Sequence, residues 1–293
     1  MLSDFDIKLP ATLEEALKDM AASAPNVAAV AGGTNVVPDL RSGRHTPPMI
    51  VDISHLKELK GISLKDGKVR INAGTTIADL LHSDVITEHA PSLFAAAKVF
   101  ASPLVRNRAT IGGNIADASP AGDTIPPLLA LGAEVELTSV SGCRLVPLDG
   151  FFLGVRRTLR KPDEILTAVL FPAHKANSKL GSGFSKVGLR KADAISVIST
   201  AVAVELDDAG NVASARIALG SVAPTPVRAK NAEAALIGKP LSAETIEKAA
   251  ELAVGDISPI DDLRASADYR RHMARVLVRR LLTEAGESMK KGV

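Results

Sequence analysis

Two short loops, each with a glycine pair and an asparagine, limit what this chain can be more than any other feature. The first lies in "VAAVAGGTNVVPDL", residues 27–40, and the second in "ATIGGNIADASPAGD", residues 109–123. Glycine has no Cβ, so its backbone N–H groups can approach an anion closely and its φ can be positive. Successive N–H groups in such a turn form an anion-binding concavity, and a helix that begins there adds the field of its dipole. Either loop is therefore a candidate cradle for phosphate.

Neither loop has the spacing of the common nucleotide-binding motifs. Neither contains the GxGxxG of a Rossmann fold, nor a GxxxxGK[ST] with its phosphate-binding lysine. A single glycine pair is most often only a tight turn. Here two pairs share the same chemistry, with Asn35 and Asn114 as amide donors and Thr34 and Thr110 as hydroxyl donors. This repetition favours a dinucleotide held between two domains.

Composition limits the number of domains, the kinds of partner and the kinds of metal site that this chain can have. At 293 residues the chain is long for one hydrophobic core, so we expect two or three domains. The 35 basic and 33 acidic residues nearly balance and only 3% of residues are aromatic, so nothing indicates a nucleic-acid partner. One cysteine, Cys143, excludes an internal disulfide and cannot by itself hold a zinc ion or an iron–sulfur cluster. With no signal-peptide pattern and no apolar run of membrane-spanning length, we expect a cytoplasmic protein.

The first two parts of the chain both mix helices and strands. Residues 1–56 contain the capping box "TLEE", which predicts a helix start, and short buried strands around the first loop, so they form a small α/β unit. Residues 57–176 combine alternating strands with alanine-rich helices. In the strand after the second loop, Val135 and Leu137 should point inward.

The third part, residues 177–293, begins after a polar linker expected at 175–179. Two alternating strands flank a turn at 207–211, which is a clear β-hairpin. A long final helix should end at Gly286 and pack through one face, formed by Tyr269, Met273, Val276 and Leu281. The chain as a whole is therefore predicted to be α+β.

Three stretches resemble the FAD-binding medium subunit of the molybdenum hydroxylases, the xanthine dehydrogenase and carbon monoxide dehydrogenase family. They are "AGGTNVVPDL", "RNRATIGGNIADASPAGDTIPPLLALGAEVEL" and "SKVGLRKADAISVIS". The resemblance extends from Phe5 to the final helix. It implies a two-subdomain FAD-binding fold of the vanillyl-alcohol oxidase/PCMH type, followed by a C-terminal α+β domain with an antiparallel sheet.

The resemblance also assigns the cofactor site. The FAD pyrophosphate would be wrapped by Ala31, Gly32, Gly33, Thr34, Asn35 and Val36. A second phosphate and ribityl loop would consist of Thr110, Ile111, Gly112, Gly113 and Asn114. Asp123 would lie near the ribityl and the flavin, while Phe100 would lie beside the cofactor and Leu166 would pack on it. The pattern of Lys186, Arg190 and Asp193 matches a loop that passes the flavin, where Lys186 would stabilise the negative charge of reduced FAD.

By this resemblance the chain is an electron-transfer component with no catalytic residue or metal ligand of its own. Electrons would come from a molybdenum cofactor on a large subunit through 2Fe-2S clusters on a small subunit to FAD here, and then to an external acceptor. The expected assembly is a dimer of heterotrimers. The basic run at 156–161 would be a solvated face or a subunit contact. FAD should be bound noncovalently, because His45, a conceivable attachment point, lies outside both loops.

Two other functions remain open. One is a self-sufficient flavin reductase of the same broad fold, similar to the enolpyruvyl-sugar reductases, which would need its own substrate domain and proton donor. No such donor is found in a matching motif. The other is a binding module that holds a nucleotide or FAD only for structure, and a flavin reduction titration would distinguish it.

Overall fold

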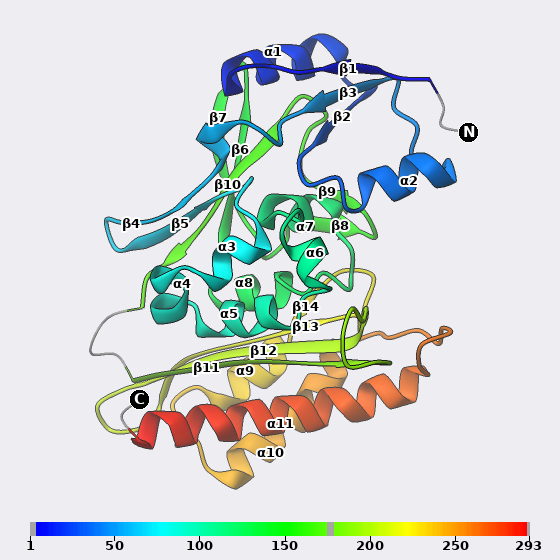
Figure 1. Ribbon diagram of the computed structural model, residues 1–293. Coiled ribbons are helices and arrows are strands. Elements are labelled where there is room, and N and C mark those ends of the chain that lie inside the picture. The colour runs from blue at the N-terminus through cyan, green and yellow to red at the C-terminus, as the bar shows by residue number, and fades with distance from the viewer. Residues whose placement is uncertain (1–3, 175–178, 292–293) are drawn as a thin grey trace.

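The computed structural model describes residues 4–174 and 179–291, and it confirms the α+β class (Figure 1). The predicted linker at 175–179 lies outside the described residues except for Lys179. Three main sheets are stacked from the N-terminal part to the C-terminal part, with three, five and four strands. In the described residues no helix is both long and apolar enough to cross a membrane. Nor do these residues contain a group of three or more His, Cys, Asp or Glu side chains able to hold a metal ion.

The N-terminal part is a parallel three-stranded sheet in the order β1–β3–β2, with helices α1 and α2. These elements are β1 (Asp6–Lys8), α1 (Leu13–Ser23), β2 (Val27–Val30), α2 (Val36–Ser42) and β3 (Met49–Asp52). The predicted helix start is confirmed, because Thr12 caps α1 and accepts from the N–H of Glu15, but the predicted capping box is incomplete: the Glu15 carboxylate accepts from the N–H of Ala11, one residue before the cap. The apolar face of α1 then packs on the sheet.

The middle part is an antiparallel five-stranded sheet in the order β4–β5–β10–β6–β7, with a small β8–β9 hairpin. Its helices α3 to α8 all follow β5 and precede β6 along the chain. Its strands are β4 (Ile62–Lys65), β5 (Lys68–Asn72), β6 (Glu134–Ser139), β7 (Gly142–Pro147), β8 (Phe152–Gly154), β9 (Arg157–Thr158) and β10 (Ile165–Pro172). Its helices are α3 (Ile77–Leu81), α4 (Asp84–His89), α5 (Pro91–Lys98), α6 (Pro103–Arg106), α7 (Ile111–Asp117) and α8 (Ile125–Ala130). Val135 and Leu137 are fully buried, as their alternation predicts.

The C-terminal part is an antiparallel sheet in the order β11–β12–β13–β14. Its elements are β11 (Lys179–Gly188), β12 (Ser196–Leu206), β13 (Val212–Gly220), β14 (Val227–Arg228), α9 (Lys230–Leu236), α10 (Ala243–Ala253) and α11 (Ala267–Lys291). The predicted hairpin is confirmed, and its turn closes with hydrogen bonds between Asp207 and Asn211. Helix α11 packs against β11 and β12 on one face of the sheet, whereas α8 of the middle part packs against β12 and β13 (Figure 1).

The expectations for the final helix were wrong in two respects. The helix continues past Gly286 to Lys291, and Gly286 packs against Leu241, where a Cβ would lie 3.1 Å from the leucine side chain. Tyr269 is 44% exposed. The buried face consists of Ala274, Leu277, Val278, Leu281, Leu282 and Ala285, so Leu281 is buried as predicted, and Met273 is half-buried against the same core. Apolar residues cover more than one face of this helix, so packing against the sheet and α10 decides which face is buried.

Candidate functional site

The first glycine loop follows β2 and leads into α2 (Figure 1). It turns at Gly33, whose φ of 72° glycine adopts without strain. In the described part of the chain, no protein group accepts from the consecutive backbone N–H groups of Gly32, Gly33, Thr34, Asn35 and Val36. Most of these residues are half-buried. Half-buried N–H groups without a protein acceptor are typical of a place where a ligand supplies one, so this loop has the properties of an anion cradle.

Gly32 determines how the two glycine loops meet. A Cβ on Gly32 would lie 1.9 Å from the carbonyl oxygen of Arg108 and 3.2 Å from the Cα of Ala109. Arg108 and Ala109 directly precede the second loop. The backbones of the two loops are therefore in contact, and any side chain at position 32 would push them apart.

The second glycine loop forms the start of α7, and its N–H groups already have protein acceptors. Thr110 caps the helix through its hydroxyl oxygen, which accepts from the N–H of Gly113 at 3.0 Å. The remaining acceptors are backbone oxygens, of Thr75 for Ile111, of Ala73 for Gly112 and of Thr110 for Asn114. The expectation that this loop is also a cradle of backbone N–H groups is therefore wrong.

The glycines of the second loop permit close packing instead. A Cβ on Gly112 would lie 2.5 Å from the Cβ of Ala73, so α7 approaches the residue that follows β5 more closely than any side chain at position 112 allows. Gly113 is exposed, and neither glycine has a positive φ. The side-chain oxygen of Asn114 accepts from the Thr124 hydroxyl at 2.7 Å. Its amide nitrogen has no acceptor among the described residues, so the second loop offers a side-chain donor beside an open glycine.

Asp123 and Lys186, both predicted to lie near the cofactor, form a buried ion pair. The Lys186 ammonium is 2.6 Å from one Asp123 oxygen, and the Ser196 hydroxyl donates to the other at 2.6 Å. Lys186 also donates to the carbonyl oxygen of Ala194. Burial raises the pKa of the Asp123 carboxyl, and the contacts with Lys186 and Ser196 oppose that rise. This pair joins the end of the second loop to β11 and β12 of the C-terminal part.

The remaining residues predicted to contact or pass the cofactor lie in the core or on an exposed loop. Phe100 and Leu166 lie in the hydrophobic core of the middle part, 9% and 5% exposed, and their contact with a cofactor stays a prediction. Arg190 and Asp193 lie on the exposed loop between β11 and β12. There the Arg190 guanidinium donates to the Asp193 carbonyl oxygen, so these two residues order their own loop.

The basic run at 156–161 is not a uniform solvated face. Arg156 forms an ion pair with Asp39 in α2, a contact that no local pattern predicts. The Arg160 side chain is directed at backbone oxygens, and it donates to that of Glu164 at 2.8 Å. Only part of the run, including Arg157 and Lys161, is exposed.

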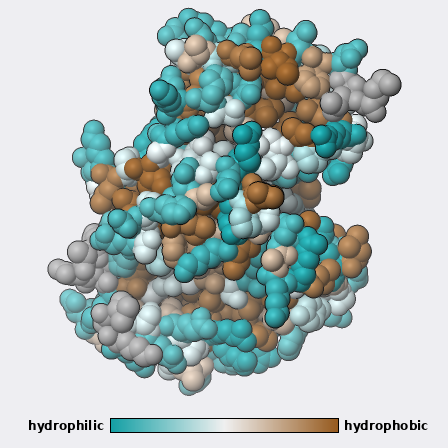
Figure 2. Space-filling view, viewed as in Figure 1, coloured by the Kyte–Doolittle hydropathy of each residue, from teal (hydrophilic) through white to brown (hydrophobic). Residues whose placement is uncertain are grey.

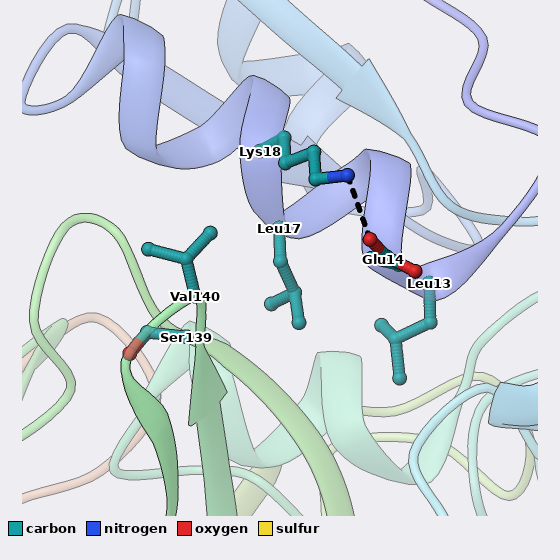
Figure 3. A pocket seen from close by; sticks show the side chains of 6 residues that line it. All are labelled: Leu13, Glu14, Leu17, Lys18, Ser139 and Val140. Carbon is teal, nitrogen blue, oxygen red and sulfur yellow. Dashed lines mark hydrogen bonds and ion pairs between the residues drawn. The ribbon is translucent and has the colours of Figure 1, made fainter.

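A surface pocket elsewhere in the molecule does not belong to this site. It has a volume of about 340 Å³ and lies between the start of α1 and the β6–β7 turn (Figure 3). Its lining consists of Leu13, Glu14, Leu17, Lys18, Ser139 and Val140, none of which is in a glycine loop. In Figure 2 the outline of the molecule narrows just below the position that α2 has in Figure 1.

Comparison with known proteins decides the family. Residues 3–174 match the FAD binding domain in molybdopterin dehydrogenase, and residues 184–285 match the CO dehydrogenase flavoprotein C-terminal domain. The chain belongs to this family.

Relatives in the family match along almost their whole length. The xanthine dehydrogenase FAD-binding subunit of Escherichia coli O157:H7 is 37% identical over 276 residues, which is 94% of each chain. The carbon monoxide dehydrogenase medium chain of Hydrogenophaga pseudoflava is 34% identical over 96% of each chain. A solved structure of carbon monoxide dehydrogenase from the same organism has a TM-score of 0.93 at 35% identity, covering 97% of this chain and 98% of that one. The recognised family and its FAD-binding fold are thereby confirmed.

The residues present fit the FAD of this flavoprotein family. A pyrophosphate carries acceptor oxygens and negative charge, which match the unpaired N–H groups of residues 32–36. Both helices that follow the loops have only seven residues, so the N–H groups themselves, rather than a helix dipole, supply the attraction. Sequence reasoning missed Asp39, Asp117, Arg156 and Ser196. Arg156 is 117 positions from its partner Asp39, so no local pattern could have indicated the contact.

Proposed function

We propose that this chain carries FAD between its two glycine loops and relays electrons within a molybdenum-containing dehydrogenase. The row of unpaired N–H groups at 32–36, held against the second loop at Gly32, is the observation that carries this proposal. When bound, FAD supplies the ability to accept two electrons and release them singly or as a pair. The chain's own contribution is to bind the cofactor and to orient it.

Each loop has a separate role in this proposal. The first loop, with Ala31 preceding its free N–H groups, holds the pyrophosphate. The second loop contributes the Asn114 amide and the open surface at Gly113, where the cofactor can approach the start of α7. The Lys186–Asp123–Ser196 group lies at the junction with the C-terminal part, where we place the flavin end of FAD. Phe100 and Leu166 support this end from the core.

The names of the relatives suggest the assembly. They include FAD-binding subunits and medium chains of xanthine, carbon monoxide and nicotinate dehydrogenases. The single cysteine of this chain cannot hold an iron–sulfur cluster alone. We therefore assign the 2Fe-2S clusters to a small partner subunit and the molybdenum cofactor to a large one, in a dimer of heterotrimers located in the cytoplasm. Within the chain, we propose functional units at 1–56, 57–176 and 177–293.

Purification of the complex from its source tests this function. We expect one FAD per chain, co-purifying iron and molybdenum, and two partner subunits identified by mass spectrometry. Acid precipitation should leave the yellow colour in the supernatant, because FAD is held noncovalently. If the chain purified alone without metals and turned over a substrate with its own FAD, it would be a self-sufficient flavin reductase instead.

A further inference from the structure

Arg156 connects the two loop regions from a third place in the chain. It lies in the tight turn between β8 and β9, with a φ of 57°. Its backbone N–H donates at 3.1 Å to the carbonyl oxygen of Ala118, which caps the C-terminal end of α7. Its guanidinium pairs with the Asp39 carboxylate in α2 and lies 4.0 Å from Asp117, the last residue of α7. One residue thus contacts the helix that follows each glycine loop.

The Asp39 carboxylate is well suited to anchor α2. Its side chain is only 9% exposed, and its second oxygen is 3.4 Å from the guanidinium of Arg44. Asp117 is also largely enclosed, at 14% exposure, and one of its oxygens has no hydrogen-bond partner in the described structure. Arg156 therefore supplies the cation between two carboxylates that come from different parts of the chain.

This contact completes the support of the first loop. Gly32 rests on the backbone of Arg108 at one end of the N–H row, and Asp39 is held by Arg156 just beyond the other end. A row of parallel N–H groups repel one another and have no internal hydrogen bonds to fix them. Contacts on both sides of the row are what can hold it in a shape that accepts a pyrophosphate.

We propose that Arg156 is a positioning residue for FAD: by bridging Asp39 and Asp117 it fixes the first loop against the second before the cofactor arrives. The inference rests on the proposed FAD site. When a binding-competent shape is populated for only a fraction of the time, the apparent affinity falls by that fraction. Loss of Arg156 should therefore weaken FAD binding even though its proposed role requires no contact with the cofactor.

The test measures the FAD dissociation constant of the full chain by flavin titration after removal of the cofactor. We expect Arg156→Gln to bind FAD about tenfold more weakly. Arg144→Gln is the matched control, because Arg144 makes a comparable pair with Glu164 at similar exposure, 40% against 43%, away from both loops. It should lower thermal stability without changing FAD affinity. Arg156→Lys, which keeps a charge for Asp39, should recover most of the affinity.

Asp39→Asn tests the same contact from the other side. Its effect and that of Arg156→Gln should be less than additive in the double variant, because both remove the Arg156–Asp39 pair. Equal FAD affinity for Arg156→Gln and the wild type, equal losses for Arg156→Gln and Arg144→Gln, no recovery with lysine, or additive effects would each overturn the inference. Failure of the wild type itself to bind FAD would overturn the proposed function instead, so the two failures are distinguishable.

Discussion

The two glycine loops look alike in sequence but use their backbones in opposite ways. In the first loop, a row of N–H groups at 32–36 has no acceptor among the residues that the structure describes. In the second, the N–H groups of Ile111 and Gly112 bond to the segment at 73–75, and a threonine cap satisfies that of Gly113. The glycines differ accordingly. Gly33 is needed for its positive φ, whereas Gly112 is needed for close packing. A glycine pair therefore indicates that the backbone comes close to another group. It does not indicate whether that group is a ligand or another part of the protein.

The largest effect is expected from Gly32→Ala. The new Cβ would lie 1.9 Å from a carbonyl oxygen of the second loop region, so the loops must separate. We expect FAD content to fall by more than about tenfold and the free energy of unfolding to fall by about 3 kcal/mol. Flavin absorbance of the purified variant and urea unfolding measure the two effects.

Gly43→Ala is the control for this variant. Gly43 ends α2, the helix after the first loop, and has a φ of 70°, but a Cβ there would have no other group within 4 Å. It should lose about 1 kcal/mol through backbone strain and retain FAD. Full FAD content in Gly32→Ala would show that contact between the loops is not required.

Lys186→Met tests the link between the end of the second loop and the C-terminal part. The substitution leaves the Asp123 carboxylate buried without its cation, at 8% side-chain exposure. We expect a loss of about 3 kcal/mol in the free energy of unfolding. Adding Asp123→Asn should restore part of that loss, since it removes the unpaired charge. A double variant less stable than Lys186→Met would contradict this account.

Removal of FAD should affect the two loops differently. The reference is protein in the presence of free FAD at a concentration one hundred times its dissociation constant. Compared with that sample, amide hydrogen exchange at 32–36 should be about 100-fold faster in the FAD-free protein. The amides of 111–114 should change much less, because protein oxygens accept from them in either state. Equal acceleration in both loops would mean that the contrast between them does not govern cofactor binding.

Two substitutions within the second loop should separate its role in packing from its role in FAD binding. Gly112→Ala affects the packing of α7, and Gly113→Ala affects the approach of FAD. The first places a Cβ 2.5 Å from Ala73 and should cost about 2 kcal/mol of stability. The second places a Cβ 2.8 Å from the Thr110 hydroxyl oxygen that caps the helix, so this side chain must shift, but alanine gains up to about 1 kcal/mol over glycine inside a helix. Gly113→Ala should therefore lose less stability than Gly112→Ala and weaken FAD binding moderately. Thermal unfolding and flavin titration of both variants provide the comparison.

The smallest effect concerns Asp117, which ends α7. Burial raises the pKa of its carboxyl above the ordinary value of 3.8, opposed in part by Arg156 and Asn35. The folded protein thus holds this proton more tightly than the unfolded chain. The contribution of Asp117 to stability falls as the pH rises from the unfolded pKa through the folded one, and is constant above it. In Asp117→Asn, urea midpoints across this window should lose that slope; an unchanged slope would assign it to another group.

Local elements of the fold could be predicted because their causes are local. The helix cap at Thr12, the alternation around Val135 and the turn at 207–211 each depend on residues close together in sequence. Helix α11 shows where this reasoning fails. Its apolar residues cover too much of the surface to define one stripe, and packing against β11, β12 and α10 selects Ala274, Leu277 and Leu281.

The sequence alone determined the family, the FAD-binding character and the positions of both glycine loops, because glycine pairs with their asparagines recur wherever a backbone must come close to another group. Only the tertiary structure decided which loop keeps its N–H groups free. The carbonyl oxygens of Ala73 and Thr75 accept from N–H groups of the second loop, while no oxygen of the described chain accepts from those of the first. The bridge from Arg156 to Asp39 was likewise decided by folding. A hydrogen bond or an ion pair needs two partners in place, and no pattern on one side of the contact identifies a partner that lies far along the chain.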